Sequence, residues 1–235
     1  MIDLSELSGP ADVAYFTRAQ AGGWGQMLRG FVKFLDLPAG ANVLDVGAGP
    51  GLLPRLLVAA GARLAVGCDD APAMLRRAVE LTEDRSGSIS ERPPGAGSET
   101  RAGPAWALVD AVRLPFARAS FDATLATNLL FLLDDPGAGL AQLVRVTRPG
   151  GTVAFVNPSD RMGIAAAQAF AGRRSLEGFD RFSFVNYGRL AEAYHRLSPA
   201  QWADLAESLG LMDVCSETRA EGLVVFGRGV KPFDG

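Results

Sequence analysis

The stretch from Val43 to Pro72, VLDVGAGPGLLPRLLVAAGARLAVGCDDAP, constrains the fold of this chain more than any other. A short apolar run that contains an acid leads into three glycines at alternate positions. An apolar segment and a second apolar run ending in acid follow. Glycines between a strand and a helix let the backbone lie unusually close to a bound molecule. The pattern predicts a strand over 43–46, a helix over 52–60 closed by Gly61, and a strand over 64–68.

Strand and helix signals keep alternating through the middle of the chain. Residues 11–36 are predicted to be helical, with a break at Ala21-Gly22-Gly23. Most later apolar runs are continuous, which is typical of strands that helices cover on both faces. The sequence therefore predicts an α/β protein with a Rossmann-like, doubly wound, mostly parallel sheet. Further helices are predicted over 72–83 and near 139–146, and further strands over 106–109, 121–127 and 152–156.

The last third of the chain interrupts this alternation. Residues 160–198 carry two helical segments, RMGIAAAQAFAG and VNYGRLAEAYHRL. Ser198 and Gln201 form a capping-box pattern that predicts a helix up to Leu209, closed by Gly210. LMDVCSET and LVVFGR, separated by RAEG, then predict two paired strands with a tight turn.

The length of 235 residues suits one domain with one sizeable core. We expect a helical segment over 1–36, a ligand-binding core over 37–158, a helical substrate-covering insertion over 159–198, and a last helix with the terminal hairpin over 199–235. Residues 85–104 are rich in Ser, Gly and Pro and are predicted to form a surface loop. An insertion without a function is favoured over a functional lid.

Charge and composition limit the kinds of partner and the cellular compartment that we expect for this chain. The net charge is −3, and adjacent arginines occur only as the isolated pairs Arg76-Arg77 and Arg173-Arg174, so no basic stripe indicates a nucleic-acid partner. The first ten residues lack the basic region of a signal peptide, and no apolar run is long enough for a membrane span. Two cysteines and one histidine predict neither a disulfide framework nor a metal site. We expect a soluble, cytoplasmic protein.

The glycine loop and two acids indicate a nucleoside ligand. Residues 47–51 have the spacing GxGxG, whereas the dinucleotide fingerprint GxGxxG needs a glycine at the position of Leu52. Asp45 would repel a pyrophosphate but attract a cofactor with a cationic end. Asp69, at the end of the second strand, can accept hydrogen bonds from both ribose hydroxyls. Asp45 and Asp110 each have an equally good structural interpretation, as residues that tie down a loop or cap a turn.

Taken together, these motifs resemble the class I S-adenosylmethionine-dependent methyltransferases. The resemblance is strongest to the small-molecule group that includes the ubiquinone and menaquinone methyltransferases. It spans about residues 40–158 through VLDVGAGPG, GCDDAPAML, LVDAVRLPF, SFDATLATNLLFLL and VTRPGGTVAFVNP. It also implies an antiparallel last strand. Ala71 departs from the Ser or Thr common at this position, so the start of the following helix should be somewhat weaker.

The resemblance implies S-adenosylmethionine as the cofactor and assigns it a set of residues. The glycine loop would approach its amino-acid part, with Asp45 near the ammonium group, and Asp69 would take the ribose hydroxyls. The segment from Asp70 to Met74 would border the adenine. The remaining residues implied are Gly47, Ala48, Gly49 and Gly51 in the loop, Asp110 and Ala111 at the adenine, and Asn128 and Leu129 at the floor near the methionine part.

Methyl transfer from a sulfonium is a direct displacement, so a dedicated base is optional. We expect a small-molecule acceptor in an aromatic-rich pocket roofed by residues 160–198. Tyr187, Leu190, Ala191, Tyr194 and Leu197 recur at helical spacing on one face.

Tyr187 and His195 are the candidate catalytic residues, although a surface histidine is the more frequent case. Tyr15 would either close over the cofactor or pack in the core. Two alternatives stay open, a Rossmann-type nucleotide-dependent oxidoreductase and a non-catalytic nucleoside-binding protein. The sequence predicts neither the acceptor atom nor the oligomeric state.

Overall fold

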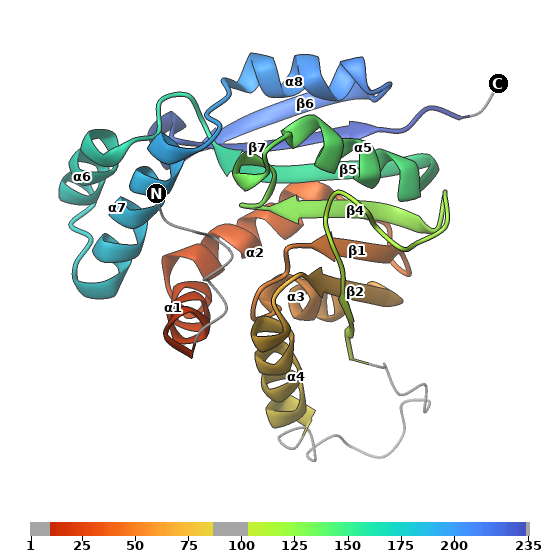
Figure 1. Cartoon of the computed structure of the whole chain (residues 1–235), viewed down its shortest axis with the longest axis horizontal. Helices are drawn as coiled ribbons and strands as arrows, with labels where there is room; N and C mark the ends of the chain where they lie inside the picture. The colour runs from red at the N-terminus through yellow and green to blue at the C-terminus, as the bar shows by residue number, and fades with distance from the viewer. Residues whose placement is uncertain (1–9, 87–102, 234–235) are drawn as a thin grey trace.

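A computed structural model describes residues 10–86 and 103–233 of the chain. Strands and helices alternate as the sequence predicts, and the expected elements are present (Figure 1). The strands are β1 (Asn42–Val46), β2 (Leu64–Asp69), β3 (Ala105–Leu108), β4 (Phe121–Thr127), β5 (Thr147–Pro158), β6 (Met212–Arg219) and β7 (Val224–Val230). The helices are α1 (Pro10–Ala21), α2 (Gly23–Leu35), α3 (Leu52–Ala60), α4 (Pro72–Ser86), α5 (Pro136–Val146), α6 (Ile164–Arg173), α7 (Gly178–Ala193) and α8 (Pro199–Ser208), with 3-10 turns η2 (Leu130–Leu132) and η3 (Ala220–Gly222).

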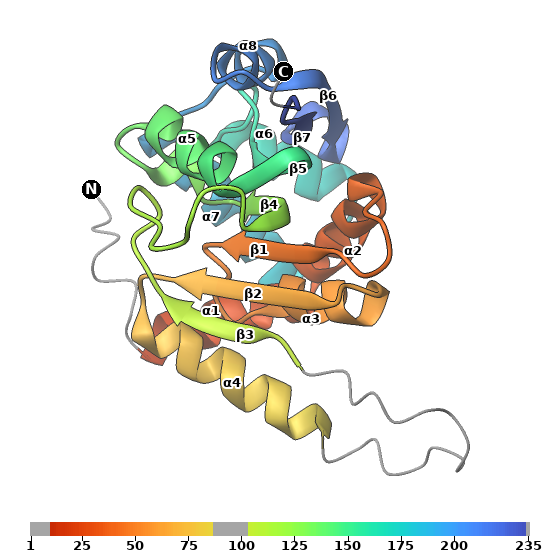
Figure 2. The ribbon, with the colours of Figure 1, turned by 90° about the vertical axis from the view of Figure 1, so that its right-hand side faces the viewer.

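The strands form one sheet in the order β3-β2-β1-β4-β5-β7-β6, which Figure 2 shows stacked from β3 to β6. The pairs among β1 to β5 are parallel, and β7 runs antiparallel to both β5 and β6. This arrangement confirms the predicted α/β class, the mostly parallel sheet and the antiparallel last strand. The terminal hairpin joins the sheet through β7, because β7 lies between β5 and β6.

Helices cover the two faces of the sheet with large aromatic side chains. Phe31 of α2 packs against Phe226 of β7, with ring centroids 5.2 Å apart. Trp202 of α8 packs against Phe155 of β5 at 5.1 Å. All four side chains are buried, and they belong to one continuous hydrophobic core. This two-sided burial explains why the central strands are almost uniformly apolar.

The carboxyl ends of β1 and β4 mark the point where the winding of the sheet changes direction. From β1 the chain continues through α3 to β2, and from β4 through α5 to β5 on the other side. Ligands of open α/β sheets bind in the crevice at such a switch point. In Figure 1 the arrowhead of β4 points towards the side of the molecule where α1, α6 and α7 gather.

Several expected boundaries were wrong. Helix α5 begins at Pro136, not near Gly139, because the side chain of Asp135 caps the amide groups of Gly137 and Ala138. Strand β5 begins at Thr147, not at residue 152. By contrast, the predicted capping box of Ser198 and Gln201 is present at the start of α8.

The second helix of the insertion ends earlier than its periodicity indicated. Helix α7 stops at Ala193, so Tyr194 and Leu197 do not continue the predicted helical face. The backbone N–H of His195 donates to the carbonyl of Phe131 instead of closing another helical turn. The predicted surface loop over 85–104 lies mostly outside the described residues. Within the described ranges, no helix is long and apolar enough to cross a membrane.

Candidate active site

The glycine loop after β1 is held against the end of β2. The backbone N–H groups of Gly47 and Ala48 donate to the carbonyl of Cys68 at 2.8 and 2.9 Å. Gly47, Gly49 and Gly51 all have positive φ angles, of 76°, 53° and 77°. Side chains with a Cβ rarely adopt this conformation, so the chain needs glycine at these turns.

The three glycines differ in what lies beside them. A Cβ on Gly51 would overlap the ring of Trp106, which packs under the loop from β3. A Cβ on Gly47 would lie 3.1 Å from the side chain of Leu129. At Gly49, the described residues place only Nε2 of Gln20 near such a Cβ, at 3.7 Å. Gly49 is therefore the position where a ligand can approach the loop most closely.

Asp45 lies beneath this loop in an unusual state for a carboxylate. It is 1% exposed, and neither of its oxygens has a hydrogen-bond partner among the described residues. Burial raises its pKa well above the usual range, and the nearby carboxylate of Asp69 raises that pKa further. An unpaired buried carboxyl group costs stability unless a cation or donor is supplied. The residue therefore fits the cationic amino group of a bound cofactor.

Asp69 joins the end of β2 to the glycine loop. Its Oδ2 accepts from the N–H of Gly49 at 2.8 Å, and its Oδ1 accepts from the N–H of Ala71 at 3.0 Å. Burial raises its pKa to about 6, although these two amide bonds act in the opposite direction. The carboxylate is held rigidly beside Gly49, with lone pairs left for a further donor.

The residues assigned to the adenine come from the segments that follow β2 and β3. Met74 of α4 is buried, whereas Asp70 and Asp110 are exposed. Oδ1 of Asp110 accepts from the N–H of Val112 at 2.9 Å, so this residue does cap a turn. Ala111 is half-buried and packs against the core. The structural role of Asp110 uses one oxygen and leaves the other for a ligand.

Asn128 and Tyr187 connect the end of β4 to helix α7. Asn128 has a φ of 56°, and its Oδ1 accepts a 2.8 Å hydrogen bond from the hydroxyl of Tyr187. Tyr187 is buried, and burial raises its pKa well above the usual value. The rings of Trp24 and Phe131 lie 4.6 and 5.6 Å from its ring. A phenol in this setting stays protonated and acts as a hydrogen-bond donor.

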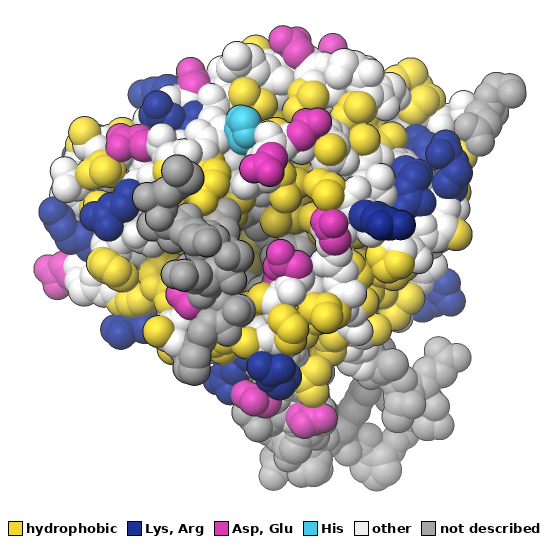
Figure 3. Space-filling model, in the orientation of Figure 1, with side chains coloured by type: hydrophobic (Ala, Val, Ile, Leu, Met, Phe, Trp, Pro, Cys, Tyr) yellow, Lys and Arg dark blue, Asp and Glu magenta, His cyan; other side chains and the backbone are white. Residues whose placement is uncertain are grey.

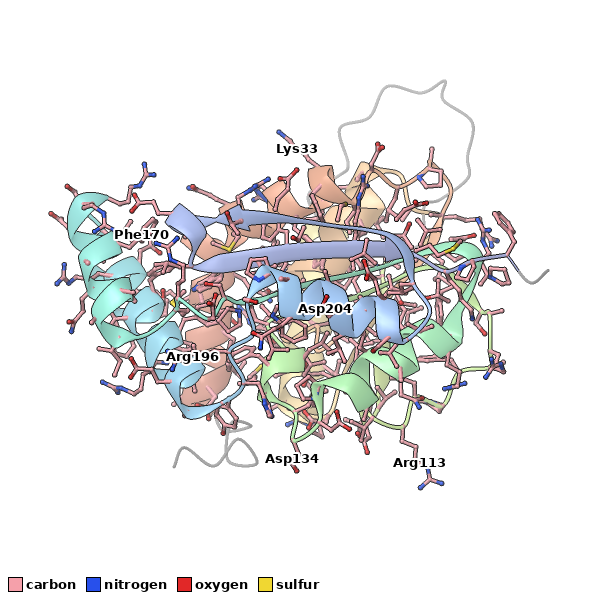
Figure 4. All side chains as sticks on the ribbon, turned by 90° about the horizontal axis from the view of Figure 1, so that it is seen from above. Lys33, Arg113, Asp134, Phe170, Arg196 and Asp204 are labelled. Carbon is pink, nitrogen blue, oxygen red and sulfur yellow. The ribbon has the colours of Figure 1, made fainter. Side chains whose placement is uncertain are left out.

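Tyr15 and His195 lie at the margin of this arrangement. The hydroxyl of Tyr15 accepts from Nδ2 of Asn186 at 3.3 Å, and its ring packs against Phe16 and Phe179. Nε2 of His195 lies 3.2 Å from the carbonyl oxygen of Asp134. The histidine is visible on the surface in Figure 3, beside acidic side chains. Figure 4 shows the exposed side chain of Asp134 pointing outward, and His195 contacts the backbone carbonyl of this residue.

Two residues at the loop were not found by sequence reasoning. Trp106 occupies the space that Gly51 and Gly67 leave free. Gln20 of α1 contacts both ends of the loop, at Ala48 and Leu52. Neither side chain belongs to a motif, because each reaches the loop only after distant segments have folded together.

Comparison with known proteins identifies the family. The methyltransferase domain family matches residues 44–155. A demethylmenaquinone methyltransferase from a Parafrankia species is 35% identical over 210 residues, covering 85% of this chain and 81% of that protein. One from Thermobifida fusca is 30% identical over 190 residues, covering 74% of each protein. This chain belongs to the methyltransferase domain family.

Solved methyltransferase structures share its fold. Phosphoethanolamine N-methyltransferase 2 of Haemonchus contortus, in complex with S-adenosylmethionine, has a TM-score of 0.69 and 16% identity, covering 97% of this chain and 58% of that one. The magnesium protoporphyrin IX methyltransferase of Synechocystis with bound S-adenosylhomocysteine has a TM-score of 0.65 and 14% identity, covering 97% and 98%. The protein is an S-adenosylmethionine-dependent small-molecule methyltransferase. The oxidoreductase and the non-catalytic binding protein are thereby set aside.

Proposed function

We propose that this methyltransferase binds S-adenosylmethionine across the carboxyl ends of β1, β2 and β4, with its amino group on Asp45. The observation that carries this assignment is the carboxyl group of Asp45, buried and without a partner directly under the glycine loop. A cofactor that brings an ammonium group offsets the cost of burying this carboxylate. A pyrophosphate at the same place would add a second negative charge.

The other cofactor roles follow from position. The loop is shaped by Gly47, Ala48, Gly49 and Gly51. Its open side at Gly49 lets the ligand lie close to the backbone. Asp69, already fixed beside Gly49, takes the ribose hydroxyls. The adenine is bordered by residues from the ends of β2 and β3, and the methionine part lies over the end of β4. These residues are Asp70, Met74, Asp110 and Ala111 for the adenine, and Asn128 and Leu129 for the methionine part.

The bound cofactor supplies an electrophilic methyl group, and the residues of this chain orient the acceptor and exclude water. Tyr187 keeps its proton and donates to Asn128, so the pair acts in positioning and not as a base. The trio of Trp24, Phe131 and Tyr187 gives the acceptor an apolar, aromatic neighbourhood. His195, bonded to the carbonyl of Asp134, is left at the rim.

The insertion over 159–198 serves as the cover of the acceptor site in this proposal. Helices α6 and α7 pack on each other, and α7 is fastened to α1 through Asn186 and Tyr15. At the opposite end, Arg173 and Arg174 both pair with Glu221 of η3. A cover fastened at two sides keeps water from the reacting atoms.

The acceptor is proposed to be a small organic molecule. Named relatives act on demethylmenaquinone, and this chain has an acidic balance with a net charge of −3, which does not favour nucleic acid. A single domain in the cytoplasm is the setting that we propose for this reaction.

Calorimetric titration with S-adenosylhomocysteine, with NADH in parallel, tests the cofactor assignment. We expect binding of S-adenosylhomocysteine at about one per chain and no binding of NADH. A screen of small phenols, quinones and amines with labelled S-adenosylmethionine then identifies the acceptor class. Binding of NADH alone would overturn the assignment of Asp45.

A further inference from the structure

Gln20 bridges the two ends of the glycine loop from helix α1. Its Oε1 accepts from the backbone N–H of Leu52 at 3.0 Å. Its Nε2 donates to the backbone carbonyl of Ala48 at 3.4 Å, which is near the limit of a hydrogen bond. One side-chain amide thus holds a donor and an acceptor of the loop at once, and one of the two bonds is weak.

These two backbone groups match the two ends of an amino acid. Leu52 begins α3, whose first N–H groups have no partner within the helix, and the preceding Gly51 offers no side-chain cap. A carboxylate accepts from such an N–H, and an ammonium group donates to a carbonyl such as that of Ala48. The amide of Gln20 satisfies both backbone groups, firmly at Leu52 and weakly at Ala48, so its Nε2 is the atom that can be released to a ligand.

Other observations place Gln20 at the same part of the site. Nε2 of Gln20 is the atom that borders the open side of Gly49, and the unpaired carboxyl group of Asp45 lies beneath the same loop. Thr17 precedes Gln20 by three residues and so shares its helix face. Its Oγ1 is buried and has no hydrogen-bond partner within the described parts of the chain. The helix face that carries Gln20 to the loop therefore also carries one buried polar group without a partner among the residues that the structure describes.

We propose that Gln20 is a cofactor-binding residue that recognises the amino-acid end of S-adenosylmethionine. The inference rests on the cofactor assignment made above. The amide exchanges its long bond to Ala48 for a charge-assisted bond to the cofactor carboxylate, and the freed carbonyl accepts from the ammonium group beside Asp45. Gln20 then makes the site selective for nucleosides that carry an amino acid, and it ties α1 to the loaded site.

The test compares two ligands that differ only in this end of the molecule. S-adenosylhomocysteine carries the amino acid, and 5′-methylthioadenosine lacks it. Gln20→Met keeps the length and apolar stem of the side chain but removes both polar atoms. Gln26→Met, at an exposed position of α2, is the matched control. Dissociation constants of both ligands are measured by calorimetry for the full chain and both variants.

We expect Gln20→Met to weaken S-adenosylhomocysteine about tenfold, the effect of losing one hydrogen bond to a charged group. Binding of 5′-methylthioadenosine should stay within about twofold of the wild type. Gln26→Met should change neither constant. Equal weakening of both ligands would show that Gln20 only holds α1 in place, and would overturn the inference.

Unchanged or tighter binding of S-adenosylhomocysteine by Gln20→Met would also overturn it, since the amide would then be a spectator or a competitor. Failure of the wild-type protein to bind either nucleoside is a different result. It would refute the cofactor site itself, and with it the inference, independently of the variants.

Discussion

The hydroxyl of Tyr187 donates a 2.8 Å hydrogen bond to Oδ1 of Asn128, and this bond joins the covering helix α7 to the end of β4. Asn128 stands in a left-handed backbone conformation, with its own N–H donating to the carbonyl of Val156 at 2.7 Å. This hydrogen bond fixes both the amide of Asn128 and the ring of Tyr187 at the switch point of the sheet, beside the carboxyl ends of β1 and β4. The acceptor site proposed here therefore includes a contact between two residues 59 positions apart in the sequence.

Removing the hydroxyl of Tyr187 tests the positioning role. Tyr187→Phe keeps the ring against Trp24 and Phe131 but leaves the amide of Asn128 free to rotate. We expect kcat to fall about tenfold, with the dissociation constant of S-adenosylhomocysteine changed by less than about twofold. The dependence of kcat on pH should keep the same shape, because the phenol does not act as a base. Tyr194→Phe, just beyond the end of α7, serves as the control.

A pH profile that loses a limb in Tyr187→Phe would contradict this account. It would show that the phenol exchanges a proton during turnover, against the direction in which burial moves its pKa.

Asp69 should make the unliganded protein less stable as the pH rises. Its pKa is raised to about 6 in the folded chain, against 3.8 for the free group, so the folded state binds the proton more tightly. The unfolding free energy contributed by this group is therefore greatest below pH 4 and decreases as the pH rises through 6. Between pH values well below 4 and well above 6, the contribution of Asp69 to the unfolding free energy falls by about 3 kcal/mol.

Asp69→Asn behaves like the protonated acid at every pH and isolates this contribution. Urea unfolding at pH 7.5 should show the variant to be more stable than the wild type, and the gap should narrow at pH 5. A stability difference that does not depend on pH would refute the raised pKa of Asp69.

Gly49 and Gly51 should respond differently to alanine. Gly51→Ala would drive a methyl group into the ring of Trp106 and destabilise the fold by about 1–3 kcal/mol, in addition to strain at its positive φ. Gly49→Ala meets only the end of Gln20, so it should cost about 1 kcal/mol of strain. Its main effect should be on the affinity for S-adenosylhomocysteine, because its methyl group enters the ligand's space.

Thermal unfolding and calorimetric titration of the two variants separate these effects. Trp106→Leu combined with Gly51→Ala should recover part of the lost stability, since the smaller side chain leaves room for the methyl group. If Gly49→Ala and Gly51→Ala lost the same amount of stability and the same amount of affinity, the two glycines would have the same role.

Much of this fold could be predicted from the sequence because its signals are local. The glycine loop, the capping box of Ser198 and the terminal hairpin each depend on a few adjacent residues. The end of α7 could not be predicted from its periodicity. The chain leaves the helix at Tyr194 because His195 bonds to the carbonyl of Phe131, a residue more than 60 positions away.

The site likewise contains residues that the sequence predicts and residues that only the folded structure shows. Asp45 and Asp69 stand at the ends of strands next to the loop, so the sequence places them. Gln20 comes from a helix that precedes the sheet, and its contact with Leu52 is visible only after folding. Trp106 likewise explains why Gly51 must be glycine, a position that spacing alone assigns to the cofactor.

The most direct test of the central claim is the affinity of Asp45→Asn for S-adenosylhomocysteine, measured together with the stability of the unliganded variant. Asp204→Asn, an exposed change on α8 (Figure 4), is the control. The account predicts that Asp45→Asn loses at least about a hundredfold in affinity, the cost of an unpaired buried ammonium, while its unliganded fold is at least as stable as the wild type. Wild-type affinity in a stable Asp45→Asn protein would contradict it.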